Sequence, residues 1–225
     1  MRRLEIEIIM AYKNILFDLD GTLTDSCSGI VNALKYSLDK MGIQEDDTEK
    51  LKSFIGSPLV KLYPEHYGFS DEDANRAVVY FREYYAEKGI YENTLYEGID
   101  ALLKGIKSSG RLCILATSKL RRVATEVLAY LKIDRYFDEV AGSNPDGTLS
   151  EKDELIQHVI ERGKYNRAET VMIGDRKFDI SGARKNGIDS IAVMYGYGTK
   201  EELEKAGPTY FSNSVSGIMK IVLHE

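Results

Sequence analysis

Strand and helix patterns alternate along most of this chain, and the alternation restricts its fold more than any other sequence feature. From residue 96 onward, short apolar runs typical of buried strands alternate with segments whose apolar residues recur at helical spacing. Parallel strands need a crossover connection, usually a helix. The pattern therefore predicts an α/β fold with a doubly wound parallel sheet, covered by helices on both faces. The predicted strands are 112–116, 137–141, 170–173, 190–195 and one near Tyr210, and the predicted helices are 99–106, 123–131, 155–160, 177–186, 200–206 and one at the C-terminus.

A helical section interrupts this alternation early in the chain. Between residues 26 and 94 no strand pattern is convincing, whereas apolar residues recur at helical spacing in two series. The segment Gly56-Ser-Pro-Leu59 is a turn signal that separates the helices. We therefore predict a core domain made of residues 11–25 and 95–225, and an inserted all-helical cap domain made of residues 26–94.

The first predicted strand, residues 15–19, ends in two carboxylates. Asp18 and Asp20 stand two positions apart, so on an extended chain their side chains point the same way. Two adjacent anions need a cation between them. Carboxylate oxygens favour Mg²⁺, which also keeps coordination positions open for a phosphate. The spacing therefore predicts a Mg²⁺ site at the end of this strand.

Other predicted strands also end in chemically useful side chains. Thr117 and Ser118 follow one strand, Asp175 and Asp179 follow another, and Lys152 lies just after the loop behind strand 137–141. In a doubly wound, Rossmann-like sheet these strand ends share one edge. Two carboxylate pairs, a hydroxyl and an ammonium around a phosphate-sized space predict a phosphoryl-transfer site, where catalysis consists mostly of positioning and charge stabilisation.

Four segments resemble the motifs of the haloacid dehalogenase (HAD) superfamily, in their usual order. They are Asp18-Leu-Asp-Gly-Thr, Thr117, Lys152 and Gly174-Asp175-Arg-Lys-Phe-Asp179. The helical insertion resembles the cap of the phosphoglycolate phosphatase-like and 5'-nucleotidase-like members. The resemblance covers essentially everything after Tyr12.

This resemblance implies a role for each motif residue. Asp18 would attack phosphorus and become an aspartyl-phosphate. Asp20 would protonate the leaving alkoxide and then activate the water that hydrolyses the intermediate. Thr117 would hold a phosphate oxygen, with Ser118 as a helper, and Lys152 would neutralise charge on the nucleophile and the phosphoryl group.

The resemblance also implies a Mg²⁺ cofactor. The ion would sit on the Asp18 carboxylate, the Asp20 backbone carbonyl and Asp175, while Asp179 would hold a metal-bound water or Lys152. Asp20 separates two chemistries within the superfamily. Displacing a halide needs no proton, and dehalogenase members lack a carboxylate at this place, so Asp20 favours phosphate-ester hydrolysis.

We expect the cap to determine substrate specificity, because the phosphate site itself contacts only phosphate. Gly56 and Pro58 belong to the turn expected to face the substrate, with Lys61 nearby as a candidate anion contact, although an ordinary turn between helices is the alternative. Lys119, Arg121 and Arg122 would either attract an anionic substrate or form the solvated first turn of a helix. Arg176 and Lys177 are given no role and are expected to face solvent.

Bulk properties exclude several classes of partner. The net charge is -6, and no long run of Lys or Arg is present, so an extended nucleic-acid or anionic-membrane surface is not expected. No segment approaches the ~20 apolar residues of a membrane span. Cys27 and Cys113 are too isolated for a disulfide framework, which fits a reducing cytoplasm. We expect a monomer or weak homodimer, with either Met1 or Met10 as the start.

Together these features predict a Mg²⁺-dependent phosphatase that hydrolyses phosphate monoesters of small metabolites. Phosphoglycolate-like acids and nucleoside 5'-monophosphates are the main candidates. One alternative is a sugar phosphomutase of the β-phosphoglucomutase type. Another is a non-catalytic phosphate-sensing or partner-binding module on the same fold. Asp20 and Lys152 argue against an inactive module, because they would serve catalysis.

Overall fold

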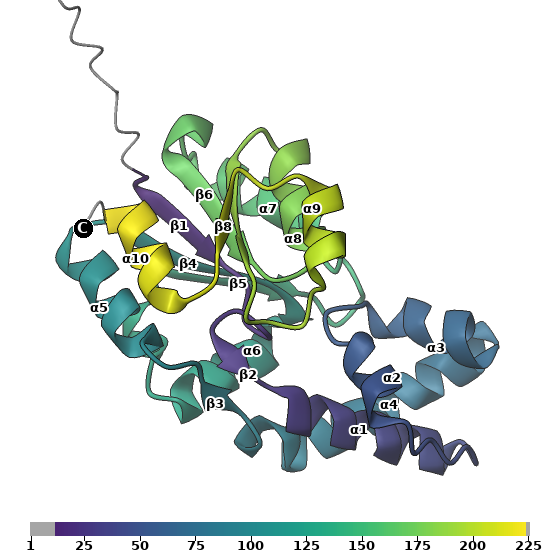
Figure 1. Cartoon of the computed structure of the whole chain (residues 1–225). Helices are drawn as coiled ribbons and strands as arrows, with labels where there is room; N and C mark the ends of the chain where they lie inside the picture. The colour runs from purple at the N-terminus through teal and green to yellow at the C-terminus, as the bar shows by residue number, and fades with distance from the viewer. Residues whose placement is uncertain (1–11, 224–225) are drawn as a thin grey trace, which may run out of the picture.

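The structure, a computed structural model, describes residues 12–223 and places a helical section beside an α/β core (Figure 1). The expected core start at residue 11 and the choice between Met1 and Met10 lie outside these residues. The core is a six-stranded sheet in the order β5-β4-β1-β6-β7-β8, with all neighbours parallel. The predicted fold class is confirmed. Its strands are β1 (Asn14–Phe17), β4 (Leu112–Leu120), β5 (Glu139–Ser143), β6 (Thr170–Gly174), β7 (Asp189–Val193) and β8 (Tyr210–Ser212).

Helices cover both faces of the sheet because its side chains alternate between apolar clusters on the two faces. Ile15 and Phe17 of β1 pack into the larger cluster, which also takes in side chains of α5 (Ile99–Ser108), α6 (Arg121–Tyr130) and α10 (Val215–Leu223). Leu16 belongs to a second cluster with α7 (Lys152–Gly163) and α8 (Lys177–Lys185). Another core helix, α9 (Lys200–Ala206), is capped by Thr199, whose hydroxyl accepts a hydrogen bond from the Glu202 backbone N–H.

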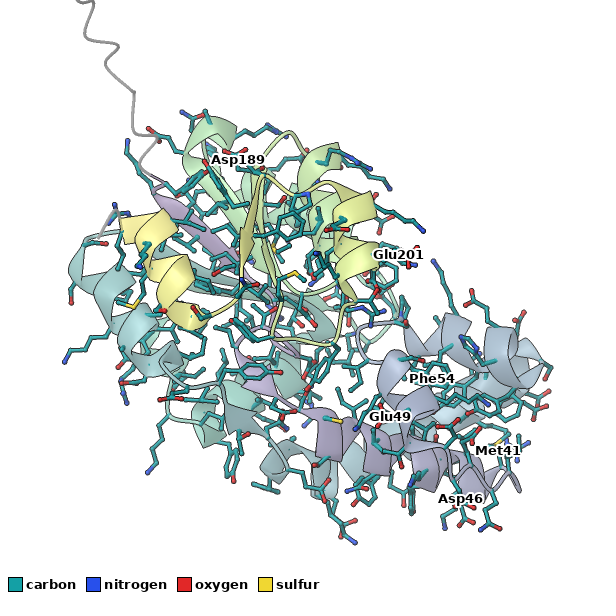
Figure 2. The ribbon with its side chains drawn as sticks, in the orientation of Figure 1. Met41, Asp46, Glu49, Phe54, Asp189 and Glu201 are labelled. Atoms are coloured by element: carbon teal, nitrogen blue, oxygen red, sulfur yellow. The ribbon has the colours of Figure 1, made fainter. Side chains whose placement is uncertain are left out.

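The central position of β1 determines where polar groups meet. Phe17 lies opposite Leu115 of β4 and Ile173 of β6, so β1 and β6 end side by side while β4 continues past them to Leu120. Asp189 begins β7 at the other end of the sheet (Figure 2), where its carboxylate accepts a hydrogen bond from the Tyr12 hydroxyl at 2.7 Å. The carboxyl ends of β1, β4 and β6 therefore form one edge.

The inserted section contains helices packed against one another. It comprises α1 (Cys27–Lys40), α2 (Thr48–Ser53), α3 (Leu59–Tyr67), α4 (Asp71–Glu87) and a short 3₁₀ helix at Gly89–Tyr91. Figure 1 shows α1 to α4 grouped to one side of the sheet and its covering helices. We propose that residues 26–94 form a cap domain on the core.

Two short strands that the sequence did not predict join the two parts. β2 (Thr24–Asp25) and β3 (Thr94–Leu95) pair antiparallel, with Thr24 opposite Leu95. Each is too short to show an alternating pattern. Their pairing places the two connections between the helical section and the core side by side.

One difference from the predicted bounds is in β4, which continues to Leu120 instead of ending near residue 116. Its pairing with β5 extends to Leu120 opposite Ser143, with a register irregularity between Thr117 and Leu120. Backbone pairing, which apolar periodicity does not report, explains the longer strand. Within residues 12–223, no helix combines the length and apolarity needed to cross a bilayer.

Candidate active site

The predicted motif residues meet at one edge of the sheet. Asp18 follows β1, Thr117 lies in β4, Asp175 follows β6 and Lys152 begins α7. A cavity of about 260 Å³ lies at this edge, and side chains from both the core and the helical section line it. Asp18, Asp20, Thr117, Ser118, Lys152 and Asp179 are among the lining residues.

Lys152 connects two of the carboxylates. Its ammonium lies 2.8 Å from Oδ1 of Asp18 and 2.9 Å from Oδ1 of Asp179, and it donates a hydrogen bond to the Ala116 carbonyl at 2.9 Å. Burial acts to lower the pKa of Lys152, but the charges of Asp179 and Asp18 outweigh it and hold the pKa above its usual value. Lys152 therefore remains a buried cation.

Three buried carboxylates converge beside this cation. Oxygens of Asp18, Asp175 and Asp179 lie within 4.8 Å of one another. Burial raises the pKa of Asp175 well above its ordinary value, and the charges of Asp179 and Asp18 add to the effect. Burial also raises the pKa of Asp179 to about 6, although Lys152 opposes that shift. This concentration of negative charge and hard oxygen donors fits a divalent cation such as Mg²⁺.

Close packing fixes the Asp175 carboxylate. Its Oδ2 accepts a hydrogen bond from the Tyr197 backbone N–H at 2.7 Å, and its Oδ1 accepts one from the Thr22 hydroxyl at 3.3 Å. Gly21 lies against the same carboxylate with φ +83°, and a Cβ atom there would stand 2.2 Å from Oδ2. Only glycine fits this position, which explains the Asp20-Gly21 pair in the first motif.

The carboxylate of Asp20 is not part of the three-carboxylate group. Oδ1 of Asp20 lies 2.8 Å from the ammonium of Lys119, whereas Asp18 pairs with Lys152. β1 ends at Phe17, so residues 18–20 do not continue as a regular strand. The two carboxylates line the same cavity with different cations as partners.

The cap residues expected near the substrate separate into two groups. Gly56 and Pro58 line the cavity. Lys61 is not among the lining residues: its side chain is 57% exposed, and its ammonium pairs with Glu151 at 2.6 Å. The structure thus brings the turn, but not this lysine, to the site.

Arg176 and Tyr85 are among the site residues that were not assigned from the sequence. Arg176, expected to face solvent, is buried, lines the cavity and donates hydrogen bonds to the Ile55 carbonyl and to Glu202. Tyr85 of α4 reaches Lys119 from the helical section. The only available signals were the place of Arg176 within the fourth motif and the helical spacing of Tyr85, and neither reveals a long-range contact.

Comparison with known proteins identifies the family of this chain. A family model described as haloacid dehalogenase-like hydrolase matches residues 15–193. The chain is 38% identical to a 5'-nucleotidase from Pseudomonas aeruginosa, over 95% of this chain and 96% of the relative. It is 31% identical to Tyrosine-protein kinase PtkA from Mycobacterium tuberculosis, over 90% and 69% of the two chains.

A solved structure has the same architecture. The crystal structure of a predicted phosphatase from Clostridium acetobutylicum superimposes with a TM-score of 0.92 at 43% identity, covering 96% of this chain and 100% of that one. The family match extends from β1 to the end of β7 and includes the helical insertion. The chain therefore belongs to the haloacid dehalogenase-like hydrolase family.

Proposed function

We propose that this protein is a Mg²⁺-dependent phosphatase that hydrolyses phosphate monoesters of small metabolites through an aspartyl-phosphate on Asp18. The observation that carries the proposal is the buried group formed by Asp18, Lys152 and Asp179, with Asp175 beside it, at the edge of a cavity that the helical section also lines. Such a group can hold a phosphoryl group next to a nucleophile while a cation neutralises the charge.

In the first step, a carboxylate oxygen of Asp18 attacks phosphorus and the bond to the leaving oxygen breaks. Lys152 orients the nucleophile and offsets negative charge as the bond forms. Thr117 is buried and lines the same cavity, and its hydroxyl would donate a hydrogen bond to a phosphate oxygen. When bound by Asp18, Asp175 and the Asp20 carbonyl, Mg²⁺ would supply further charge neutralisation and orient the phosphate, with Asp179 supporting this set.

Asp20 supplies proton transfer in both steps. It gives a proton to the leaving alkoxide in the first step and takes one from the attacking water in the second. Water then hydrolyses the acyl phosphate, which releases inorganic phosphate and restores the Asp18 carboxylate. Lys119, the ion-pair partner of Asp20, keeps the Asp20 carboxylate apart from the Asp18 nucleophile.

The cavity supports an organic leaving group of some size. Its cap side is largely apolar, and Phe54, labelled in Figure 2, contributes to it. Other apolar cap residues that line it include Ile30, Leu34, Ile55, Leu59, Val60, Leu62, Val78 and Phe81. This lining favours a nucleoside 5'-monophosphate over phosphoglycolate, and the similarity to a 5'-nucleotidase agrees with that order.

Substrate profiling tests the proposal. Purified protein with Mg²⁺ is given nucleoside monophosphates, 2-phosphoglycolate and sugar monophosphates, and inorganic phosphate is measured. We expect phosphate release with at least one class, and its loss in Asp18→Asn. Isomerised sugar phosphate without free phosphate would indicate a mutase. A long-lived phosphorylated Asp18 without turnover would indicate a phosphate-sensing module.

A further inference from the structure

We propose that Lys119 is a positioning residue that holds the Asp20 carboxylate in place and couples it to the cap through Tyr85. The inference rests on the proposed phosphatase function. This role differs from the attraction of an anionic substrate that the sequence suggested for Lys119.

Lys119 and Asp20 form a nearly buried ion pair. The ammonium lies 2.8 Å from Oδ1 of Asp20, and the two side chains are only 11% and 13% exposed. Within residues 12–223, Lys119 is the only cation that forms an ion pair with Asp20. Because a partly desolvated carboxylate depends on its remaining polar partners, Lys119 determines where this carboxylate rests.

The backbone delivers Lys119 to this position through the irregularity in β4. The register shift between Thr117 and Leu120 brings the Lys119 segment against Gly142 of β5. A Cβ atom at Gly142 would stand 2.6 Å from the Lys119 carbonyl oxygen, so only glycine allows this approach. The placement of Lys119 is therefore built into the pairing of β4 with β5.

The second partner of Lys119 comes from the cap. Its ammonium donates a hydrogen bond to the Tyr85 hydroxyl at 2.7 Å and lies 4.2 Å from the centre of that ring. The same hydroxyl accepts a hydrogen bond from the Asn93 side chain at 3.0 Å. Asn93, which directly precedes β3, also donates hydrogen bonds to the Gly89 and Ile90 carbonyls.

These bonds form a continuous chain from the connection at β3 to Asp20. The chain runs from Asn93 to Tyr85, from Tyr85 to Lys119 and from Lys119 to Asp20. If the cap moves away from the core, Tyr85 leaves the ammonium and the Asp20 carboxylate loses part of its support. Proton transfer by Asp20 would then be competent only with the cap in the position seen here.

Leaving-group dependence separates a role through Asp20 from a general structural role. An alkyl phosphate needs a proton on its leaving oxygen, whereas 4-nitrophenyl phosphate releases a stable phenolate without one. We measure the first-turnover rate of leaving-group release in Lys119→Met. The rate with the alkyl phosphate should fall about 100-fold, in the range of general acid catalysis. The rate with the aryl phosphate should fall less than about 5-fold, because its leaving group needs no proton.

A double variant provides the decisive comparison. If Lys119 acts through Asp20, Asp20→Asn with Lys119→Met should be no slower on the alkyl phosphate than Asp20→Asn alone. Tyr85→Phe keeps the ring and should give the same selectivity with a smaller loss, which preserves the test if Lys119→Met does not fold. Lys104→Met changes an exposed lysine of α5 and should match the wild type.

Three outcomes would overturn the inference while leaving the phosphatase function intact. The first is an equal loss of rate on both phosphates, and the second is a double variant in which the losses of the two single variants add. The third is a wild-type rate in both Lys119→Met and Tyr85→Phe. By contrast, a wild-type protein that releases neither leaving group would reject the phosphatase proposal itself.

Discussion

The ammonium of Lys152 lies 2.8 Å from Oδ1 of Asp18, although 134 positions separate the two residues in the chain. The contact exists because β1 is central in the sheet and α7 begins with Lys152 beside the ends of β1 and β4. It places a permanent positive charge against the proposed nucleophile. The electrostatics of the site, and its stability, depend on this pair.

Removing Lys152 should destabilise the protein strongly. Lys152→Met leaves Asp18, Asp175 and Asp179 buried without their cation, a change that typically costs about 3–5 kcal/mol. Denaturant unfolding in chelator measures the loss, and added Mg²⁺ should recover part of it. Lys13→Met is the matched control, because Lys13 pairs with Glu169 at 2.7 Å on the surface and should cost no more than about 1 kcal/mol. Equal losses in the two variants would contradict the expectation.

The pKa of Asp179 predicts an unusual pH dependence of stability without metal. Burial raises the pKa from 3.8 to about 6, so the folded protein keeps a proton that the unfolded chain has already released. The contribution of this proton to the free energy of unfolding is fully present below about pH 4 and is lost as the pH rises through about 6. Relative to Asp179→Asn, the wild type should lose on the order of 3 kcal/mol across this interval.

Unfolding of both proteins in chelator between pH 4 and pH 7 measures this difference. The comparison with Asp179→Asn removes the contribution of the titrating groups that do not interact with Asp179. A stability difference that stays constant or grows with pH would show that Asp179 is ionised throughout.

Gly21 should be indispensable for metal binding. Gly21→Ala introduces a Cβ atom 2.2 Å from Oδ2 of Asp175, so the carboxylate must move. Gly42→Ala is a close control, because Gly42 has φ +79° and nothing lies near the new Cβ atom. Both substitutions should destabilise the protein by about 1 kcal/mol through backbone strain. Only Gly21→Ala should abolish the rise in melting temperature that Mg²⁺ produces. A normal Mg²⁺ response in Gly21→Ala would remove Asp175 from the proposed metal set.

Arg176 should restrain the cap against the core. It donates to the Ile55 carbonyl in the helical section and to Glu202 of α9, so Arg176→Met should loosen the segment that contains Gly56. Hydrogen exchange at residues 54–59 should accelerate, and KM should rise about 10-fold if this segment contacts substrate. Arg184→Met is the control, because Arg184 donates to the Ala206 carbonyl within the core. Unchanged exchange in Arg176→Met would exclude the restraint.

The sequence predicted the parts of this protein that depend on local pattern and on strand ends. Apolar runs located the strands, and their polar ends identified Asp18, Lys152 and Asp175 as neighbours because parallel strands share one carboxyl edge. The fold class is confirmed on this basis.

What the sequence did not reveal depends on contacts between distant segments. The pairing of β2 with β3 involves two residues on each side, too few for a periodic signal. The burial of Arg176 and the contact of Lys119 with Tyr85 depend on how the helical section packs against the core. Lys61 was expected near the substrate because it follows the turn, but its side chain instead pairs with Glu151.

Trapping the covalent intermediate tests the central claim most directly. The protein is mixed with a hydrolysable phosphate ester and Mg²⁺, quenched during turnover, treated with borohydride and analysed by peptide mass spectrometry. Borohydride reduces an aspartyl-phosphate to homoserine, so the phosphatase mechanism predicts homoserine at position 18 in the wild type and none in Asp18→Asn. Phosphate release without modification at Asp18, or modification at another aspartate, would contradict it.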